Sequence, residues 1–137
     1  MNIKLVTSVL TAALFALNTA NAMPPKPAKC PDPSAIANVG FDVVEKDNQG
    51  TWVAGVMSNP FNTQDNWTFV VGKIKATSQS DARAKATASL KTLKFIQGPI
   101  AIEQYNVWGC AYGTAVGYPA VSITPAMGVS NASTLVE

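Results

Sequence analysis

The sequence predicts an α+β fold: a small antiparallel sheet of about five strands, with one helix packed on a face and one disulfide. Runs of β-prone residues, separated by turn-forming residues, lie both before and after a single stretch of helical character. Two cysteines lie far apart in a chain whose N-terminus has the pattern of an export signal. The 137 residues are enough for one small domain.

Residues 1–22 are predicted to be a secretory signal peptide that is removed. Lys4 precedes an apolar run over residues 5–17, and small residues close the segment at Ala20-Asn21-Ala22. A helix over that run is about 20 Å long, too short for the ~30 Å core of a bilayer. We therefore expect a processed chain that starts at Met23, has no membrane span, and is secreted or periplasmic.

Residues 23–33 form a proline-rich leader, which favours extended backbone with few hydrogen bonds. Cys30 lies inside this leader, and the other cysteine is Cys110. An even number of cysteines in an exported chain predicts one disulfide, which would fasten the leader to the C-terminal half. The alternative is two free buried thiols, and the lack of a C-x-x-C spacing argues against a redox-active pair. Residues 23–29 are expected to remain loose.

A single domain is predicted over residues 34–126, entered through a short helical turn over residues 32–38. Residues 41–46 and 51–57 then flank four turn-forming residues, which predicts a hairpin. A calcium loop is the alternative use of the hairpin's acidic residues, although the fuller set of oxygen ligands is missing. Those acidic residues are Asp42, Glu45 and Asp47.

Residues 67–74 are predicted to form the third strand. Trp67, Phe69 and Val71 would share one face of it, and apolar residues also occupy the other face. A strand that is apolar on both faces belongs in the middle of a sheet, because both of its faces must be covered.

Residues 78–95 have the pattern of a helix, with Ser80 as N-cap and Asp81 in the first turn. Apolar residues at helical spacing form one stripe: Ala82, Ala86, Leu90 and Leu93. Three lysines lie off this stripe: Lys85, Lys91 and Lys94. They are predicted to form a solvated face, and contact with an anionic surface is the alternative.

The C-terminal third begins after Gln97-Gly98-Pro99, which is expected to end the helix. Residues 100–108 are predicted to be a strand, residues 111–118 are interrupted by glycine, and residues 119–124 form a last short strand. Residues 127–137 are small and polar, which predicts a flexible C-terminal tail.

The composition excludes several functional classes. The chain contains no histidine, the usual general base near pH 7 and the commonest metal ligand. A net charge of +2 does not provide the basic stripe that nucleic-acid binding needs. The cysteines are expected to be paired, and no phosphate-binding or dinucleotide motif occurs. We therefore expect a protein that is not an enzyme and has neither a metal site nor a nucleic-acid partner.

Aromatic residues and glycines gather around Cys110. Tyrosine and tryptophan combine an apolar ring with a polar group, which suits recognition surfaces. The candidate ligand-binding residues are Tyr105, Trp108, Tyr112 and Tyr118. The alternative is that these side chains only pack over the disulfide.

Three parts of the chain carry a resemblance to a known family: the export signal, Lys29-Cys30-Pro31 leading into Val39-Gly40-Phe41, and Trp108-Gly109-Cys110-Ala111-Tyr112-Gly113. With these features the chain resembles a family of small secreted proteins from Legionella and related bacteria, one of which is called hemin-binding protein. The resemblance spans nearly all of the processed chain. It implies a secreted or periplasmic protein with heme as a candidate ligand. In the absence of histidine, Tyr105, Tyr112 or Tyr118 would have to ligate the iron as tyrosinate.

The sequence thus predicts an exported, non-enzymatic binding protein. Its partner would be heme, another small apolar ligand, or a host or envelope macromolecule. The first alternative is a periplasmic or secreted inhibitor of a lysozyme-type hydrolase, which rests on an analogy between folds. The second is a hydrolase that uses two carboxylates.

Overall fold

The computed structural model describes residues 22–137, so all but the last residue of the predicted signal peptide lies outside the described residues. The strands of this part are β1 (Val43–Lys46), β2 (Trp52–Asn59), β3 (Trp67–Ile74), β4 (Lys94–Ile102), β5 (Val107–Gly113) and β6 (Pro119–Thr124). The α-helices are α2 (Pro33–Ala37), α3 (Gln79–Ser89) and α4 (Val129–Ser133), and short 3-10 helices are η1 (Leu90–Thr92), η2 (Glu103–Tyr105) and η3 (Thr134–Val136).

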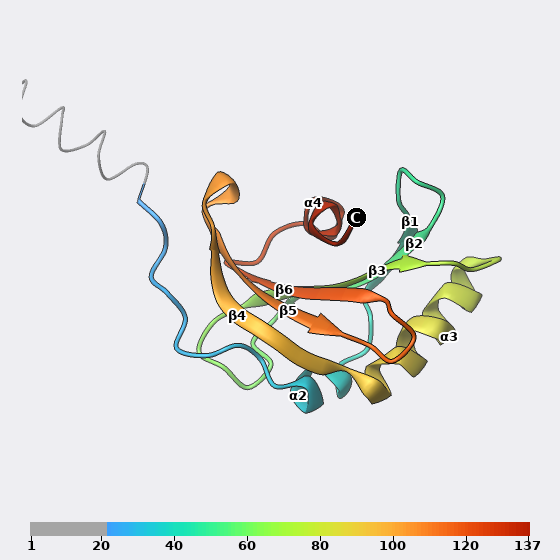
Figure 1. Cartoon of the computed structure of the whole chain (residues 1–137), viewed down its shortest axis with the longest axis horizontal. Coiled ribbons are helices and arrows are strands. Elements are labelled where there is room, and N and C mark those ends of the chain that lie inside the picture. Colours follow the sequence, from blue (N-terminus) through green and yellow to red (C-terminus); the bar gives the residue numbers. More distant parts are fainter. Residues whose placement is uncertain (1–21) are drawn as a thin grey trace, which may run out of the picture.

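The six strands form one antiparallel sheet in the order β1-β2-β3-β6-β5-β4 (Figure 1). The α+β class, the first hairpin, and the bounds of β3 and β6 are as predicted. The predicted number of about five strands is wrong. The predicted strand over residues 100–108 is wrong, because it joins the end of β4 to the start of β5 across η2. The first residues of β4 were not predicted as strand, because Gly98 and Pro99 were interpreted as the end of a helix. A strand at the sheet edge tolerates proline, and the pairing of β4 with β5 shifts register there.

Strand β3 lies between β2 and β6, which confirms its predicted central position. Trp67, Phe69 and Val71 enter the core beneath α2 and α3, whereas Val70 enters a second core beneath α4. Both faces of this strand are therefore buried, as its apolar residues on alternate positions require.

Helix α3 is shorter than the predicted helix over residues 78–95, since Leu93 has extended backbone and β4 starts at the next residue. Its N-cap is Ser78, not Ser80: the Ser78 hydroxyl accepts a hydrogen bond from the amide of Asp81 at 3.1 Å. The predicted apolar stripe is buried against the sheet, from Ala82 and Ala86 in the helix to the residues that follow it.

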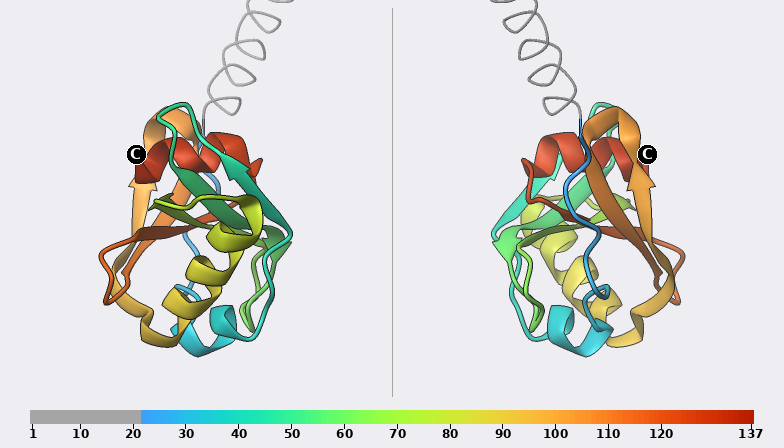
Figure 2. Two further views of the ribbon diagram at one scale, coloured as in Figure 1. Left: turned by 90° about the vertical axis from the view of Figure 1, so that its right-hand side faces the viewer. Right: turned by 90° about the vertical axis from the view of Figure 1, so that its left-hand side faces the viewer.

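Helices cover both faces of the sheet, not one face as predicted. In Figures 1 and 2, α2 and α3 lie on one side and α4 on the other. The predicted flexible tail, residues 127–137, instead contains α4 and η3, which bury Val129, Ala132 and Val136. Gly55 and Gly72 make room for this segment. A Cβ at Gly72 would lie 2.4 Å from Val136 Cγ2, and one at Gly55 would lie 2.8 Å from Val129 Cγ2.

Candidate functional site

A disulfide joins Cys30 to Cys110, as predicted, with the two Cα atoms 6.0 Å apart. It attaches the leader to β5 on the same side of the sheet as α2 and α3. Figure 2 shows the leader, in blue, running down the molecule between the β4–β5 hairpin and the β2–β3 connection. Residues 23–29 were expected to be loose, but in the structure the leader packs against defined partners.

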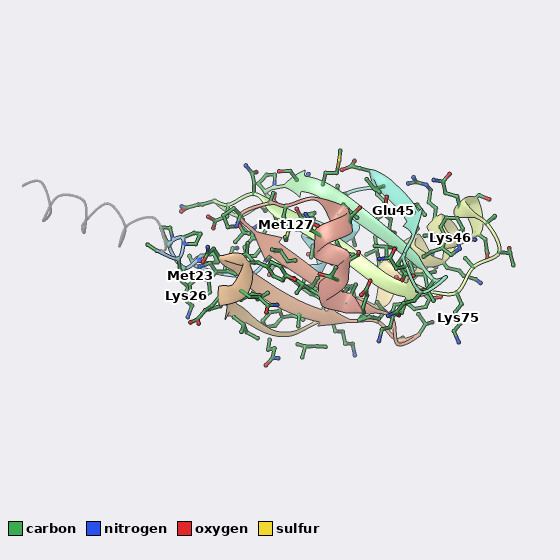
Figure 3. All side chains as sticks on the ribbon, turned by 90° about the horizontal axis from the view of Figure 1, so that it is seen from above. Met23, Lys26, Glu45, Lys46, Lys75 and Met127 are labelled. Atoms are coloured by element: carbon green, nitrogen blue, oxygen red, sulfur yellow. A yellow bond between two sulfur atoms is a disulfide. The ribbon has the colours of Figure 1, made fainter. Side chains whose placement is uncertain are left out.

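Trp108 is half-buried on β5 and contacts the beginning of the leader. Its indole N–H donates a hydrogen bond to the Pro24 carbonyl at 2.9 Å. The Lys26 ammonium lies 5.9 Å from the centre of the same ring, within range of a cation–π interaction. Figure 3 shows Met23 and Lys26 beside the end of the β4–β5 hairpin.

Tyr112 lies on the same face of β5 but is buried in the core. Its hydroxyl donates a hydrogen bond to the Pro31 carbonyl at 2.5 Å, and its ring meets Phe69 and Phe95 edge-on. Burial raises the pKa of Tyr112 to about 12, although a hydrogen bond with Ser122 opposes this rise. A neutral, buried phenol that is already hydrogen-bonded is poorly placed to ligate iron as tyrosinate.

The other two tyrosines lie apart from this pair. Tyr105 is in η2, between β4 and β5, and 44% of it is exposed. Tyr118 is half-buried at the opposite end of β5, just before β6, and packs against the core. The four predicted residues therefore do not line one cleft. Trp108 and Tyr112 pack against the leader and the disulfide region, which was the alternative considered for this cluster.

A different site lies where η1, the first residues of β4 and the β5–β6 turn meet. We call this groove of about 510 Å³ the lysine groove. Its lining residues are Lys91, Thr92, Lys94, Ile96, Gly113, Thr114 and Ala115. Ile96 is 62% exposed, and its side chain lies over Gly113, where a Cβ would be 3.2 Å from Ile96 Cδ1. The groove therefore combines an exposed apolar side chain with two cations, Lys91 and Lys94.

The lysines of this groove have no acidic partner among residues 22–137, where the only ion pair joins Lys85 to Asp81. Both Lys91 and Lys94 are exposed. A smaller pocket of about 200 Å³, lined in part by Val116 and Tyr118, lies next to the lysine groove and shares Thr92 with it. The Thr92 hydroxyl accepts a hydrogen bond from the amide of Ala115 at 3.0 Å, which ties η1 to the β5–β6 turn.

The lysine groove was missed in the sequence because the start of β4 was missed. Lys91 and Lys94 were predicted to lie on the solvated face of a helix over residues 78–95. In the structure Lys94 and Ile96 are alternate residues of one strand, so the two side chains lie toward the same groove. No alternation of polar and apolar residues marks this strand, because Lys94 is followed by two apolar residues and all three side chains are exposed.

Asp47, one of the acidic residues of the alternative calcium loop in the first hairpin, uses its carboxylate to bind the turn. This carboxylate accepts hydrogen bonds from the amides of Gln49 and Thr51, at 2.8 and 3.1 Å, and from the Thr51 hydroxyl. Burial acts in the opposite direction, but these hydrogen bonds lower the pKa of Asp47. Its oxygens thus stabilise the turn itself. Within residues 22–137 no three acidic, cysteine or histidine side chains are grouped so that they could hold a metal ion.

None of the helices formed by residues 22–137 is both long enough and apolar enough to cross a membrane. A comparison of the chain with protein families, curated proteins and solved structures found no match.

Proposed function

We propose that the protein is an exported binding protein without catalytic activity, whose ligand is an amphiphilic anion held in the lysine groove. The observation that carries the proposal is the pairing of an exposed apolar surface, at Ile96, with two ammonium groups that lack carboxylate partners among the described residues. A ligand of this class has an apolar body and at least one carboxylate.

The groove suits such a ligand in size and in chemistry. Its volume of about 510 Å³ lies within the range of roughly 300–1,000 Å³ that is usual for small-molecule sites. Burial of the ligand's apolar body against Ile96 would supply the non-directional part of the affinity. Lys91 and Lys94 would pair with the carboxylate and so fix its orientation.

Heme belongs to this ligand class, because its flat apolar ring carries two propionates. A fatty acid belongs to it as well. Tyr112 is buried and bonded to Pro31, so the candidate phenolate ligands for a heme iron are reduced to Tyr105 and Tyr118. Neither of these lines the lysine groove, and the proposal therefore rests on the propionates and not on the iron.

Export is supported by the disulfide, which persists in oxidising compartments and is rare in the cytosol. A disulfide-linked domain that presents the open lysine groove is compatible with a protein that captures a ligand outside the cell or in the periplasm.

The test is titration of the purified full chain with hemin, followed by its absorption spectrum, and with dodecanoate, followed by calorimetry. We expect the double variant Lys91→Gln/Lys94→Gln to bind about tenfold more weakly, because two ion pairs of roughly 0.5–1 kcal/mol each are lost. The matched control is Lys73→Gln/Lys75→Gln, which removes the same charge from two exposed lysines outside the groove.

Ile96→Ser tests the apolar half of the groove and is expected to weaken both ligands. The proposal fails if neither ligand binds saturably, or if the Lys91/Lys94 variant binds as tightly as its control. Hemin binding that is lost in Tyr105→Phe or Tyr118→Phe, and not in the lysine variant, would assign heme to a phenolate instead.

A further inference from the structure

Two aromatic side chains of β5 bind the leader through its carbonyl groups. The Trp108 indole N–H donates to the Pro24 carbonyl, and the Tyr112 hydroxyl donates to the Pro31 carbonyl. Proline has no N–H, so its carbonyl oxygen is the one backbone group through which a proline-rich segment can be recognised. Aromatic surfaces with such donors are the usual means by which proteins bind extended proline-rich peptides.

The leader carries the matching pattern. Pro24 and Pro27 are three residues apart, which is the repeat of a polyproline helix, and Pro27 is buried between exposed neighbours. Lys26, between these two prolines, places its ammonium group near the face of the Trp108 ring. Trp108 therefore contacts both the Pro24 carbonyl and the Lys26 ammonium group of the leader.

The leader is held by side chains and not by strand pairing. Among residues 22–137, no backbone–backbone hydrogen bond involves residues 22–31. Besides the disulfide and the hydrogen bond of Tyr112 to Pro31, these residues are linked to the sheet by the hydrogen bond at Pro24 and by the cation–π contact of Lys26 with Trp108. Residues 23–29 can thus leave the sheet without breaking any strand pairing.

The space around the leader is also wider than the leader itself. Cavities of about 350 and 370 Å³ both include Ala28 and Lys29 in their walls. One is completed by residues 62–65 of the β2–β3 connection, and the other by Phe95, Gly98 and Pro99 of β4. A segment with larger side chains than Ala28 has room at this position.

From these observations we infer that the Trp108 face of β5 is a binding groove for an extended proline-rich peptide, which residues 23–29 occupy in cis. The external partner is a proline-rich segment of another protein, which displaces residues 23–29 while Cys30 stays attached to Cys110. The disulfide keeps the displaced segment close, at an effective concentration of order millimolar. A weak external peptide is therefore excluded until the leader is loosened.

The experiment compares the full chain with its Pro24→Gly/Pro27→Gly variant, which keeps Cys30 but loses the stiffness and the contacts of the leader. The probe is a synthetic peptide with the sequence of residues 23–29, and the readout is the indole N–H resonance of Trp108 in NMR spectra. We expect saturable binding to the variant and at least tenfold weaker binding to the unmodified chain.

Trp52 provides the matched control for the indole. Its N–H donates to the Ala76 carbonyl at 3.2 Å, and Lys46 lies 5.5 Å from its ring centre, so its surroundings repeat those of Trp108 at another place on the sheet. In the Pro24→Gly/Pro27→Gly background, Trp108→Phe should weaken peptide binding at least tenfold, and Trp52→Phe should not change it. Peptide binding to the Trp108→Phe and Trp52→Phe variants is followed by the fluorescence of a label on the peptide. Lys91 and Lys94 lie in a different site, so the same Trp108→Phe change should leave the binding of hemin or dodecanoate unaltered.

The inference is overturned if the loosened variant does not bind the peptide, or if Trp108→Phe binds it as tightly as Trp52→Phe. Should the double glycine variant lose its fold, the unmodified chain is titrated up to about ten times the millimolar effective concentration. Saturable binding of the fluorescently labelled peptide to the unmodified chain then supports the inference, and the absence of binding overturns it. Dimers linked from Cys30 of one copy to Cys110 of another would show that the groove takes the leader of a second copy, and would also overturn it.

Discussion

The hydroxyl of Tyr112 joins parts of the chain that lie far apart in the sequence. It donates to the carbonyl of Pro31 in the leader and lies 3.4 Å from the hydroxyl of Ser122 on β6. Pro31 is itself buried, so its carbonyl depends on this donor for a partner. A buried carbonyl that loses its donor costs free energy, because no water replaces it.

Tyr112→Phe is therefore expected to lower the free energy of unfolding by about 1–3 kcal/mol, since the ring still fits while the Pro31 carbonyl loses its partner. Tyr105→Phe is the control, because Tyr105 is exposed and such surface changes stay within about 0.5 kcal/mol. Urea unfolding of both variants measures the difference. Equal stability of the two would show that the bond to Pro31 contributes nothing.

Tyr112 also makes the free energy of unfolding depend on pH in the alkaline range. The pKa of Tyr112 is raised to about 12 in the folded protein, above its ordinary value of 10.0, so the neutral phenol is the favoured form. Its contribution is complete below pH 10 and is lost as the pH rises toward 12. Over that range the unfolding free energy of the unmodified protein should fall relative to that of Tyr112→Phe.

At the scale of elements, helices and strands could be predicted where a long, uninterrupted pattern of apolar residues lies within the element itself. The stripe from Ala82 to Leu93 and the bounds of β3 follow from such patterns, and both are found in the structure. The start of β4 was missed because Gly98 and Pro99 interrupt its pattern. α4 was missed because its five residues are too few for an apolar period to be evident.

The place of α4 is determined by residues on other strands, which no local pattern reports. Gly55 on β2 and Gly72 on β3 leave the space that Val129 and Val136 fill. The lysine groove could not be predicted from the sequence for the same reason. It combines residues of η1, β4 and the β5–β6 turn, and it forms only when β4 is paired with β5.

Gly72→Ala is expected to destabilise the protein by about 1–3 kcal/mol, because the new methyl group would overlap Val136 Cγ2. Adding Val136→Ala removes the overlapping carbon, so the double variant should be more stable than the sum of the two single changes predicts. Gly40→Ala, where a Cβ meets nothing within 4 Å, is the control. Denaturant unfolding of the four variants tests this, and strict additivity would contradict the packing of η3 on β3.

At the scale of the whole molecule, the disulfide is the strongest constraint, because it links positions 80 residues apart. A cross-link that closes so long a loop restricts the unfolded chain more than a short one does. It also holds the leader against β5, where Trp108 and Tyr112 bind its carbonyls.

Cys30→Ser/Cys110→Ser is expected to lower the unfolding free energy by up to roughly 4–5 kcal/mol, according to the chain-entropy account of loop closure. This is a large part of the ~5–15 kcal/mol that stabilises a typical domain. The measurement is the guanidinium midpoint of the double variant, with the unmodified chain under reducing conditions as the comparison. A loss below about 1 kcal/mol would be inconsistent with a long-range constraint on the unfolded state.

The strand order also governs when the molecule can close during synthesis. β6 lies between β3 and β5, so the sheet consists of two separate antiparallel units, β1-β2-β3 and β5-β4, until β6 joins them. β6 is the last strand to be made, and α4 then covers the exposed side of β2 and β3. A nascent chain that still lacks residues 119–124 has no strand that can pair with both units, so the six-stranded sheet is complete only after these residues have been made.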